Sequence, residues 1–116
     1  MEIRIIKEPI SREELKQIAQ EGFGYLVKAV VDVKQGIMAL GGELHADGEV
    51  LLSEQGSRRE HTWGINIYPE KSEEEWIEFD SMVNLKPSFG NRSRGVENKN
   101  IQQEIRNIVH KLISEV

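Results

Sequence analysis

The longest run of alternating apolar and polar residues extends from Trp76 to Leu85. Ile77, Phe79, Val83 and Leu85 occupy one set of alternate positions, with Ser81 between them. Glu78, Asp80, Met82 and Asn84 occupy the other set. A two-residue period is typical of a strand with one buried face. Pro87 cannot donate to a strand ladder, so we expect this strand to end before it.

Shorter runs of the same kind predict a sheet. Residues 3–6 form a β-prone run that Pro9 closes. Alternation between 25 and 33, the short Lys34-Gln35-Gly36 connection and the apolar run 37–40 are typical of a β-hairpin. Residues 62–68 alternate again, with Trp63, Ile65 and Ile67 on one face.

Two segments have the three-to-four-residue apolar period of a helix. Ser11 and Glu14 form an S-x-x-E capping box, in which the serine hydroxyl accepts from a free backbone N–H of the first turn, and it predicts a helix over about 11–21. A longer helix starts at Asn98 or Asn100. Its broad apolar face comprises Ile101, Ile105, Ile108, Val109, Leu112 and Ile113.

The segment from Glu43 to Gln55 has two interpretations. Asp47-Gly48 is a strong turn dipeptide and would join two short strands. A helix would instead place Asp47 in the first turn and end at Gly56. An interior Gly48 costs a helix about 1 kcal/mol relative to alanine. We favour the helix because Val50-Leu51-Leu52 does not alternate.

Together these elements predict an α+β fold. Strands with one apolar face belong to an antiparallel sheet that is covered on one side, and helices with one apolar stripe supply the cover. We therefore expect a single domain over 1–116, a two-layer sandwich in which two or three helices pack on one face of a mainly antiparallel sheet. Its outer face would carry Lys28, Asp32, Asn66, Tyr68, Glu78, Asp80 and Asn84.

Charge and composition narrow the functional classes. The net charge of −5 argues against a general nucleic-acid-binding protein, which normally has a basic excess. The absence of cysteine excludes disulfides, thiolate metal sites and cysteine nucleophiles. No apolar run approaches the roughly 20 residues of a membrane-spanning helix, and the first residues lack a signal-peptide pattern, so we expect a cytoplasmic protein without a membrane partner.

A polar loop between Ser88 and Gly95 is the first candidate site. Its arginines offer planar forks suited to phosphate or carboxylate oxygens, and a helix begins shortly afterwards. We therefore predict a small anionic, phosphate-bearing ligand bound by Asn91, Arg92, Ser93 and Arg94, with Asp80, Asn66 and Asn84 lining the adjacent sheet face. The alternative is that the arginines pair with internal carboxylates. The loop lacks the spacing of a P-loop, no other phosphate-loop pattern fits it, and the sequence does not identify a cofactor.

Two other functions compete with ligand binding. Met82, Val30 and Tyr68 would lie on the outer sheet face, so the protein would be an interaction module that forms a homo-oligomer through that face. Alternatively, His45, Asp47 and Asp80 would act together in a hydrolase or transferase. The histidines have no known metal-ligand spacing, and we predict no metal site.

Two segments carry a resemblance to known sequences. They are Trp63-Gly64-Ile65-Asn66-Ile67-Tyr68-Pro69 and the stretch from Glu78 to Glu97, with its Glu-Phe-Asp-Ser-Met and Gly-Asn-Arg-Ser-Arg-Gly-Val-Glu runs. With residues 30–33 and 42–47, they resemble a family of small prokaryotic proteins classed only as a domain of unknown function. The resemblance spans nearly the whole chain. It implies no particular activity, substrate or catalytic residue.

Overall fold

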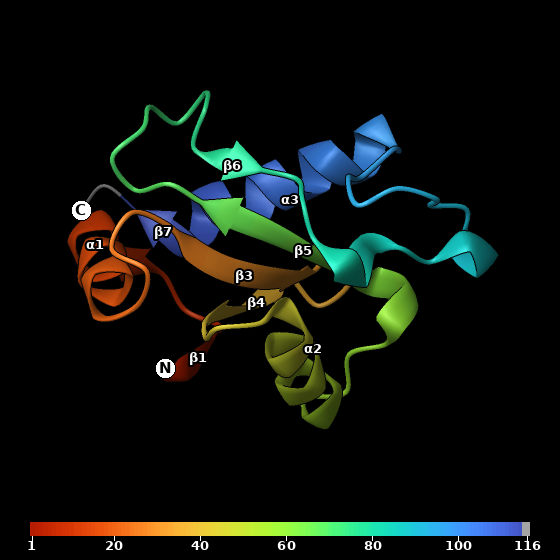
Figure 1. Ribbon diagram of the computed structural model, residues 1–116, viewed down its shortest axis with the longest axis horizontal. Helices are drawn as coiled ribbons and strands as arrows, with labels where there is room; N and C mark the ends of the chain where they lie inside the picture. The colour runs from red at the N-terminus through yellow and green to blue at the C-terminus, as the bar shows by residue number, and fades with distance from the viewer. Residues whose placement is uncertain (115–116) are drawn as a thin grey trace.

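A five-stranded antiparallel sheet forms the centre of the computed structural model, which describes residues 1–114 (Figure 1). Its strands are β1 (Ile3–Ile6), β3 (Val27–Asp32), β4 (Ile37–Gly41), β5 (Thr62–Ile67) and β6 (Ile77–Glu78). Their spatial order is β1-β4-β3-β5-β6, and each neighbouring pair is antiparallel. A separate parallel pair joins β2 (Ile10–Ser11) to β7 (Ile113–Ser114).

Three α-helices cover the sheet from both sides. α1 (Arg12–Glu21) and α3 (Lys99–Leu112) pack over the main core, whose central side chains are Val31, Met38, Leu40, Ile65 and Ile67. α2 (His45–Glu54) packs over a second, smaller core of Val30, Ile37, Ala39 and Leu52. Figure 1 shows α2 and α3 on opposite sides of the strands. None of the helices within residues 1–114 is long and apolar enough to cross a membrane.

The α+β class and the antiparallel sheet are therefore confirmed, but the placement of all helices on one face is wrong. The reason lies in the hairpin residues that alternate with those facing the main core. Val30, Ile37 and Ala39 point away from the main core and are themselves apolar. A sheet face with this composition needs its own cover, because leaving it exposed would forfeit roughly 25 cal/mol for each Å² of apolar surface.

The local signals of α1 and the hairpin are confirmed at atomic level. The hydroxyl of Ser11 accepts a hydrogen bond from the backbone N–H of Glu14 at 3.1 Å, as a helix cap does. Between β3 and β4, Asp32 Oδ1 accepts from the N–H groups of Lys34 and Gln35 at 2.8 and 3.1 Å. Gly36 follows with a φ of 69°, a backbone conformation that glycine adopts without strain.

The segment around Gly48 is a helix, as favoured, and the glycine has a packing role. A Cβ atom at this position would lie 3.2 Å from Val30 Cγ2 and 3.3 Å from the Ala39 Cβ. The missing side chain thus lets α2 lie close against β3 and β4. This contact opposes the intrinsic helix penalty of glycine.

The strand predicted between Trp76 and Leu85 is largely wrong. Only Ile77 and Glu78 pair with β5, at Ile67 and Asn66. The chain then turns at Ser81, whose hydroxyl accepts from the N–H of Val83 and begins a short 3₁₀ helix, η2 (Met82–Asn84). The alternation holds only in part as a burial pattern: Ile77, Ser81 and Val83 are buried and Glu78 and Met82 are exposed, but Asn84, expected on the outer face, is fully buried.

Lys86 anchors the chain after this turn. Two more 3₁₀ helices, η1 (Arg59–His61) and η3 (Pro87–Phe89), lie near it in sequence or space. The Lys86 side chain is almost completely buried, and its ammonium group donates to the carbonyl oxygens of Arg59 and Thr62. The same group lies 4.3 Å from the centre of the Trp63 ring, a cation–π contact. These contacts hold the 79–97 region against the start of β5.

Candidate functional site

A cavity of about 230 Å³ lies between the first turn of α2 and the chain that follows β6. The sheet contributes Lys28 and Asn66 to its wall, and α2 contributes His45. The chain after β6 contributes Asp80 and Arg94. Leu44 and Met82 also line the cavity and are 57% and 62% exposed. The cavity thus brings together side chains from four separate parts of the sequence.

Strand pairing sets the sheet side of the cavity. Lys28 on β3 is opposite Asn66 on β5, and Asn66 is opposite Glu78 on β6. Three polar side chains therefore lie side by side across three strands. The Asn66 amide donates to Glu78 Oε1 at 2.8 Å, and the Tyr68 hydroxyl donates to the same oxygen at 3.0 Å.

The carbonyl oxygen of the Asn66 side chain has no hydrogen-bond partner within residues 1–114, although Asn66 is only 8% exposed. Its orientation is fixed, because the amide nitrogen donates to Glu78 and the oxygen must face the other way. An unpaired buried acceptor is destabilising and is therefore rare in folded proteins. This atom is the clearest unsatisfied group in the wall of the cavity.

His45 is the first residue of α2, and its ring is held by the backbone of β5. The Nε2 atom lies 2.8 Å from the carbonyl oxygen of Ile65, which can only accept, so Nε2 carries a proton. Burial lowers the pKa of His45 below its usual value, and Lys28 lowers it further. The Ile65 carbonyl, Asp80 and the Asn66 side chain oppose this shift. The ring is thus mainly neutral at pH 7, with a lone pair on Nδ1.

Arg94 and Asp80 form an ion pair at the rim of the cavity. Arg94 Nε lies 2.8 Å from Asp80 Oδ1, and the two side chains are 56% and 45% exposed. Such a solvated pair contributes little to stability, commonly less than about 1 kcal/mol. A guanidinium has four further N–H bonds on its Nη atoms, and none of these has a partner in the described part of the chain. They are free to bind a ligand oxygen.

Of the seven predicted site residues, Asn66, Asp80 and Arg94 line this cavity, whereas Asn84, Asn91, Arg92 and Ser93 do not. Asn91 instead ties the loop together, since its amide donates to the carbonyl oxygens of Asn84 and Gly95, each at 2.8 Å. Ser93 accepts from the N–H of Gly95. Arg92 is exposed, and its backbone N–H donates to Glu97. The loop therefore does not present its polar side chains to one common point.

The residues of the predicted catalytic alternative are also divided. His45 and Asp80 line the same cavity, but Asp47 is exposed on α2 and lies outside the wall. Within residues 1–114, no three histidine, aspartate or glutamate side chains come close enough together to hold a metal ion.

Lys28 is the site residue that sequence reasoning placed on the sheet face but did not assign to a site. Its signal is a lone cation within the apolar run Val27 to Val31. A cation in the middle of a central strand is unusual unless a partner or a cavity receives it. Only the register of β3 with β5, which brings it beside Asn66, identifies that cavity.

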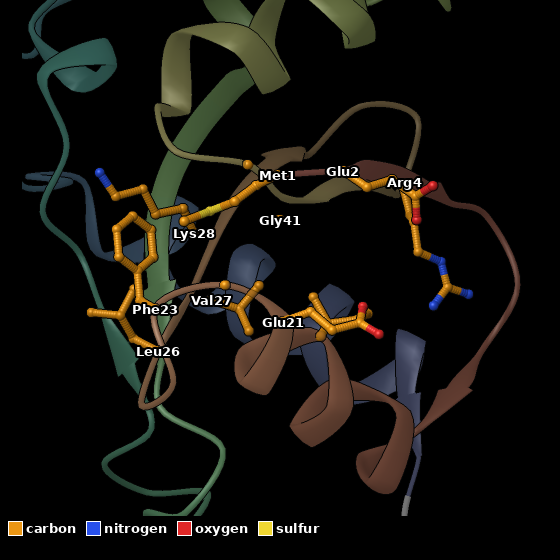
Figure 2. A pocket seen from close by; sticks show the side chains of 12 residues that line it. Met1, Glu2, Arg4, Glu21, Phe23, Leu26, Val27, Lys28 and Gly41 are labelled. Atoms are coloured by element: carbon orange, nitrogen blue, oxygen red, sulfur yellow. The ribbon is translucent and has the colours of Figure 1, made fainter.

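A second, smaller cavity of about 70 Å³ is also lined by Lys28 (Figure 2). Met1, Phe23 and Leu26 are among its lining residues, and Figure 2 shows the Lys28 side chain extending beside the Phe23 ring. The ammonium group lies 5.3 Å from the centre of that ring. This cavity is too small for most metabolites, so we place the candidate site at the larger one.

The chain was compared with models of protein families, with curated proteins and with solved structures. A family model described as "Protein of unknown function (DUF5674)" matches residues 4–112. Searches of curated proteins and of solved structures each gave no match. The family match confirms the predicted resemblance to a family of unknown function, and it covers nearly all of the described residues. The chain therefore belongs to the DUF5674 family, whose function is unknown.

Proposed function

We propose that this protein binds a small anionic metabolite in the cavity between α2 and the chain after β6. The observation that carries the proposal is the charge of the cavity wall. Lys28 and Arg94 supply two cations and Asp80 supplies one carboxylate, in a chain whose net charge is −5. A local positive excess in an acidic protein favours an anion there over bulk solvent.

The free donors of the two cations support the same ligand. Arg94 uses only Nε on Asp80, which leaves its Nη atoms for a pair of phosphate or carboxylate oxygens. Leu44, the residue before α2, provides no side-chain cap, so no capping side chain offsets the positive end of the helix dipole at this turn. The sequence predicted an anion site that uses both Arg92 and Arg94. The proposal keeps Arg94 and assigns the role of the second cation to Lys28 instead of Arg92.

The test compares two arginines of one loop. Arg94→Gln and Arg92→Gln each remove one positive charge, but only Arg94 lines the cavity. Thermal unfolding would be followed with increasing propyl phosphate. A ligand at about 100 times its dissociation constant stabilises by roughly 2.7 kcal/mol, which raises the melting temperature by several degrees.

We expect this shift in the wild type and in Arg92→Gln, and a much smaller shift in Arg94→Gln and Lys28→Gln. Equal shifts in all four proteins would place the anion elsewhere and would overturn the proposal. So would a shift that disappears only in Arg92→Gln.

The exposed rim of the cavity favours a second candidate, the interaction module. Leu44 and Met82 are large apolar side chains left in solvent on either side of the opening. Such residues are enriched at interface centres. A molecular mass that rises with concentration in the wild type, but stays that of a monomer in Met82→Glu, would support this alternative. A monomer at millimolar concentration would exclude a homo-oligomer.

A further inference from the structure

We propose that the ligand carries a hydroxyl group next to its anionic group, and that His45 Nδ1 accepts a hydrogen bond from that hydroxyl. The inference deepens the proposed function and rests on it. It names the class of ligand as a short hydroxylated anion, either a hydroxyalkyl phosphate or a hydroxycarboxylate. It also makes His45 a specificity-determining residue.

The first step is the fixed tautomer of His45. Because Nε2–H donates to the Ile65 carbonyl at 2.8 Å, the neutral ring can only accept at Nδ1. The Asn66 side chain is the polar side chain that acts on this ring, but its unpaired oxygen is also an acceptor, so it cannot pair with a neutral Nδ1. His45 lines the cavity, so Nδ1 is the acceptor that a bound molecule can reach.

The second step is the balance of donors and acceptors in the wall. Lys28 and Arg94 offer donors, which an anion satisfies. His45 Nδ1 and the unpaired oxygen of Asn66 are acceptors, which a fully ionised phosphate or carboxylate cannot satisfy. A ligand that fills this cavity without a donor would shield Nδ1 from water and leave it unpaired, which is costly.

The third step selects a hydroxyl rather than an ammonium group. Both are donors, but an ammonium would stand beside Lys28 and Arg94, and like charges repel. The volume of about 230 Å³ is below the roughly 300–1,000 Å³ of sites for drug-sized molecules. A three- or four-carbon skeleton with one anionic group and one or two hydroxyls fits both constraints.

The experiment uses two matched pairs of probes on the full chain. Glycerol 3-phosphate is compared with propyl phosphate, and glycerate with propionate, by titration calorimetry at pH 7.5. In each pair only the hydroxyls differ. We expect the hydroxylated member to bind at least about tenfold more tightly, because its absence leaves a polar group unpaired in the site. The pair with the lower dissociation constants identifies phosphate or carboxylate as the anionic group.

His45→Leu tests the assigned acceptor, and Arg92→Gln is the matched control outside the cavity. His45→Leu should lose the preference for the hydroxylated probe and should retain most of the affinity for the probe without hydroxyls. Arg92→Gln should keep both affinities. If His45→Leu keeps the tenfold preference, the hydroxyl is read elsewhere and the inference is overturned.

A pH series on the wild type tests the same point without a mutation. The carboxylate pair is used because its ionisation is simple to correct for: glycerate stays ionised down to pH 5, whereas propionate begins to protonate there, so each dissociation constant is calculated for the ionised probe. Protonation converts Nδ1 into a donor, so the preference for glycerate should shrink at low pH while propionate binds more tightly. A preference independent of pH would contradict the inference.

The outcomes also separate the two proposals. If both members of each pair bind equally, and Arg94→Gln weakens that binding, the hydroxyl inference is overturned and the anion site remains. No binding of any of the four probes at millimolar concentration would overturn both.

Discussion

The side-chain amide of Asn84 pairs with the backbone of Gly64 as another strand would. The N–H of Gly64 donates to Asn84 Oδ1 at 2.8 Å, and Asn84 Nδ2 donates to the Gly64 carbonyl at 3.0 Å. β6 pairs with β5 only at Asn66 and Ile67, so the amide continues the ladder beyond the end of β6. Asn84 Nδ2 also donates to the carbonyl of Arg94 at 2.8 Å. One buried amide thus connects β5 to the segment that carries Arg94.

Removing this amide should destabilise the protein strongly. Asn84→Ala leaves the N–H and carbonyl of Gly64 buried without partners, and each such group costs about 1–3 kcal/mol. We expect a loss of about 3 kcal/mol in the free energy of unfolding, measured by urea denaturation. Asn107→Ala, on the exposed side of α3, is the control and should change stability by less than about 0.5 kcal/mol. A small effect at Asn84 would mean that water replaces its hydrogen bonds.

Gly64 should not tolerate a side chain. A Cβ atom there would lie 2.6 Å from both Cβ and Oγ of Ser81 and 2.8 Å from Val83 Cγ2. Overpacking of this kind typically costs about 1–3 kcal/mol. Gly64→Ala should therefore lower the melting temperature, and Ser81→Gly in the same chain should recover part of the loss. Ser81→Gly alone measures the loss of its hydrogen bond to Val83, and a double-mutant cycle separates that loss from relief of the clash. If the effects of the two substitutions simply add, the clash with Ser81 is not the cause.

Lys86 should make stability rise with pH. Burial lowers the pKa of its ammonium group from 10.5 to about 8, while Glu49 opposes the shift. Between these two values the unfolded chain binds more protons than the folded chain, so raising the pH favours folding. Lys86→Met cannot titrate and should lack this contribution.

The measurement is the difference in the free energy of unfolding between wild type and Lys86→Met. It should shift in favour of the wild type by on the order of 2–3 kcal/mol as the pH rises from about 7.5 to 10. Tyr68, whose pKa is raised chiefly by burial and by its bond to Glu78, is present in both proteins, so its contribution cancels. A difference independent of pH would show that Lys86 titrates normally.

Asp32 should give a dependence of the same sign in the acidic range, where stability falls as the pH falls. Burial alone would raise the pKa of this carboxyl, but hydrogen bonds from Ser57, Gln35 and Lys34 outweigh it and lower the pKa. The ionised group therefore stabilises the fold above its unfolded pKa, and this stabilisation is lost as the pH falls through the lower folded value.

Asp32→Asn keeps the size of the side chain but removes the charge and one acceptor oxygen. We expect it to cost about 2 kcal/mol at pH 7, and we expect the gap to narrow as the pH falls below about 4. Unfolding curves for both proteins at several pH values test this. Glu8→Gln, at an exposed position before β2, should show no comparable effect. A gap that stays constant down to pH 3 would contradict the assignment.

The local elements of this fold could be predicted because their causes are local. The cap at Ser11, the turn at Gly36 and the apolar stripe of α3 each depend on residues a few positions apart. The region after Glu78 could not, because its backbone is determined by partners far away in the sequence. Its alternation matches burial only in part, and its backbone path depends on the hydrogen bonds of Asn84 to Gly64 and of Lys86 to Thr62.

The candidate site was predictable only in part for the same reason. Asn66, Asp80 and Arg94 could be named from polar positions near strands and loops. These residues line the same cavity as Lys28 and His45 because of the strand register and because α2 packs on the second sheet face. The apolar character of Val30 and Ala39 was the available signal for that placement.

The strand order has a consequence for how the sheet assembles. Its two central strands, β3 and β4, are neighbours in sequence, and only the turn at Lys34 to Gly36 separates them. Closing a short loop is fast and costs little entropy, whereas β1 and β5 can join only after much longer segments close. We expect the hairpin to form early and to act as a template, with β1 adding along β4 and β5 along β3. Substitutions in the hairpin should then slow folding, and those in β1 or β6 should mainly speed unfolding.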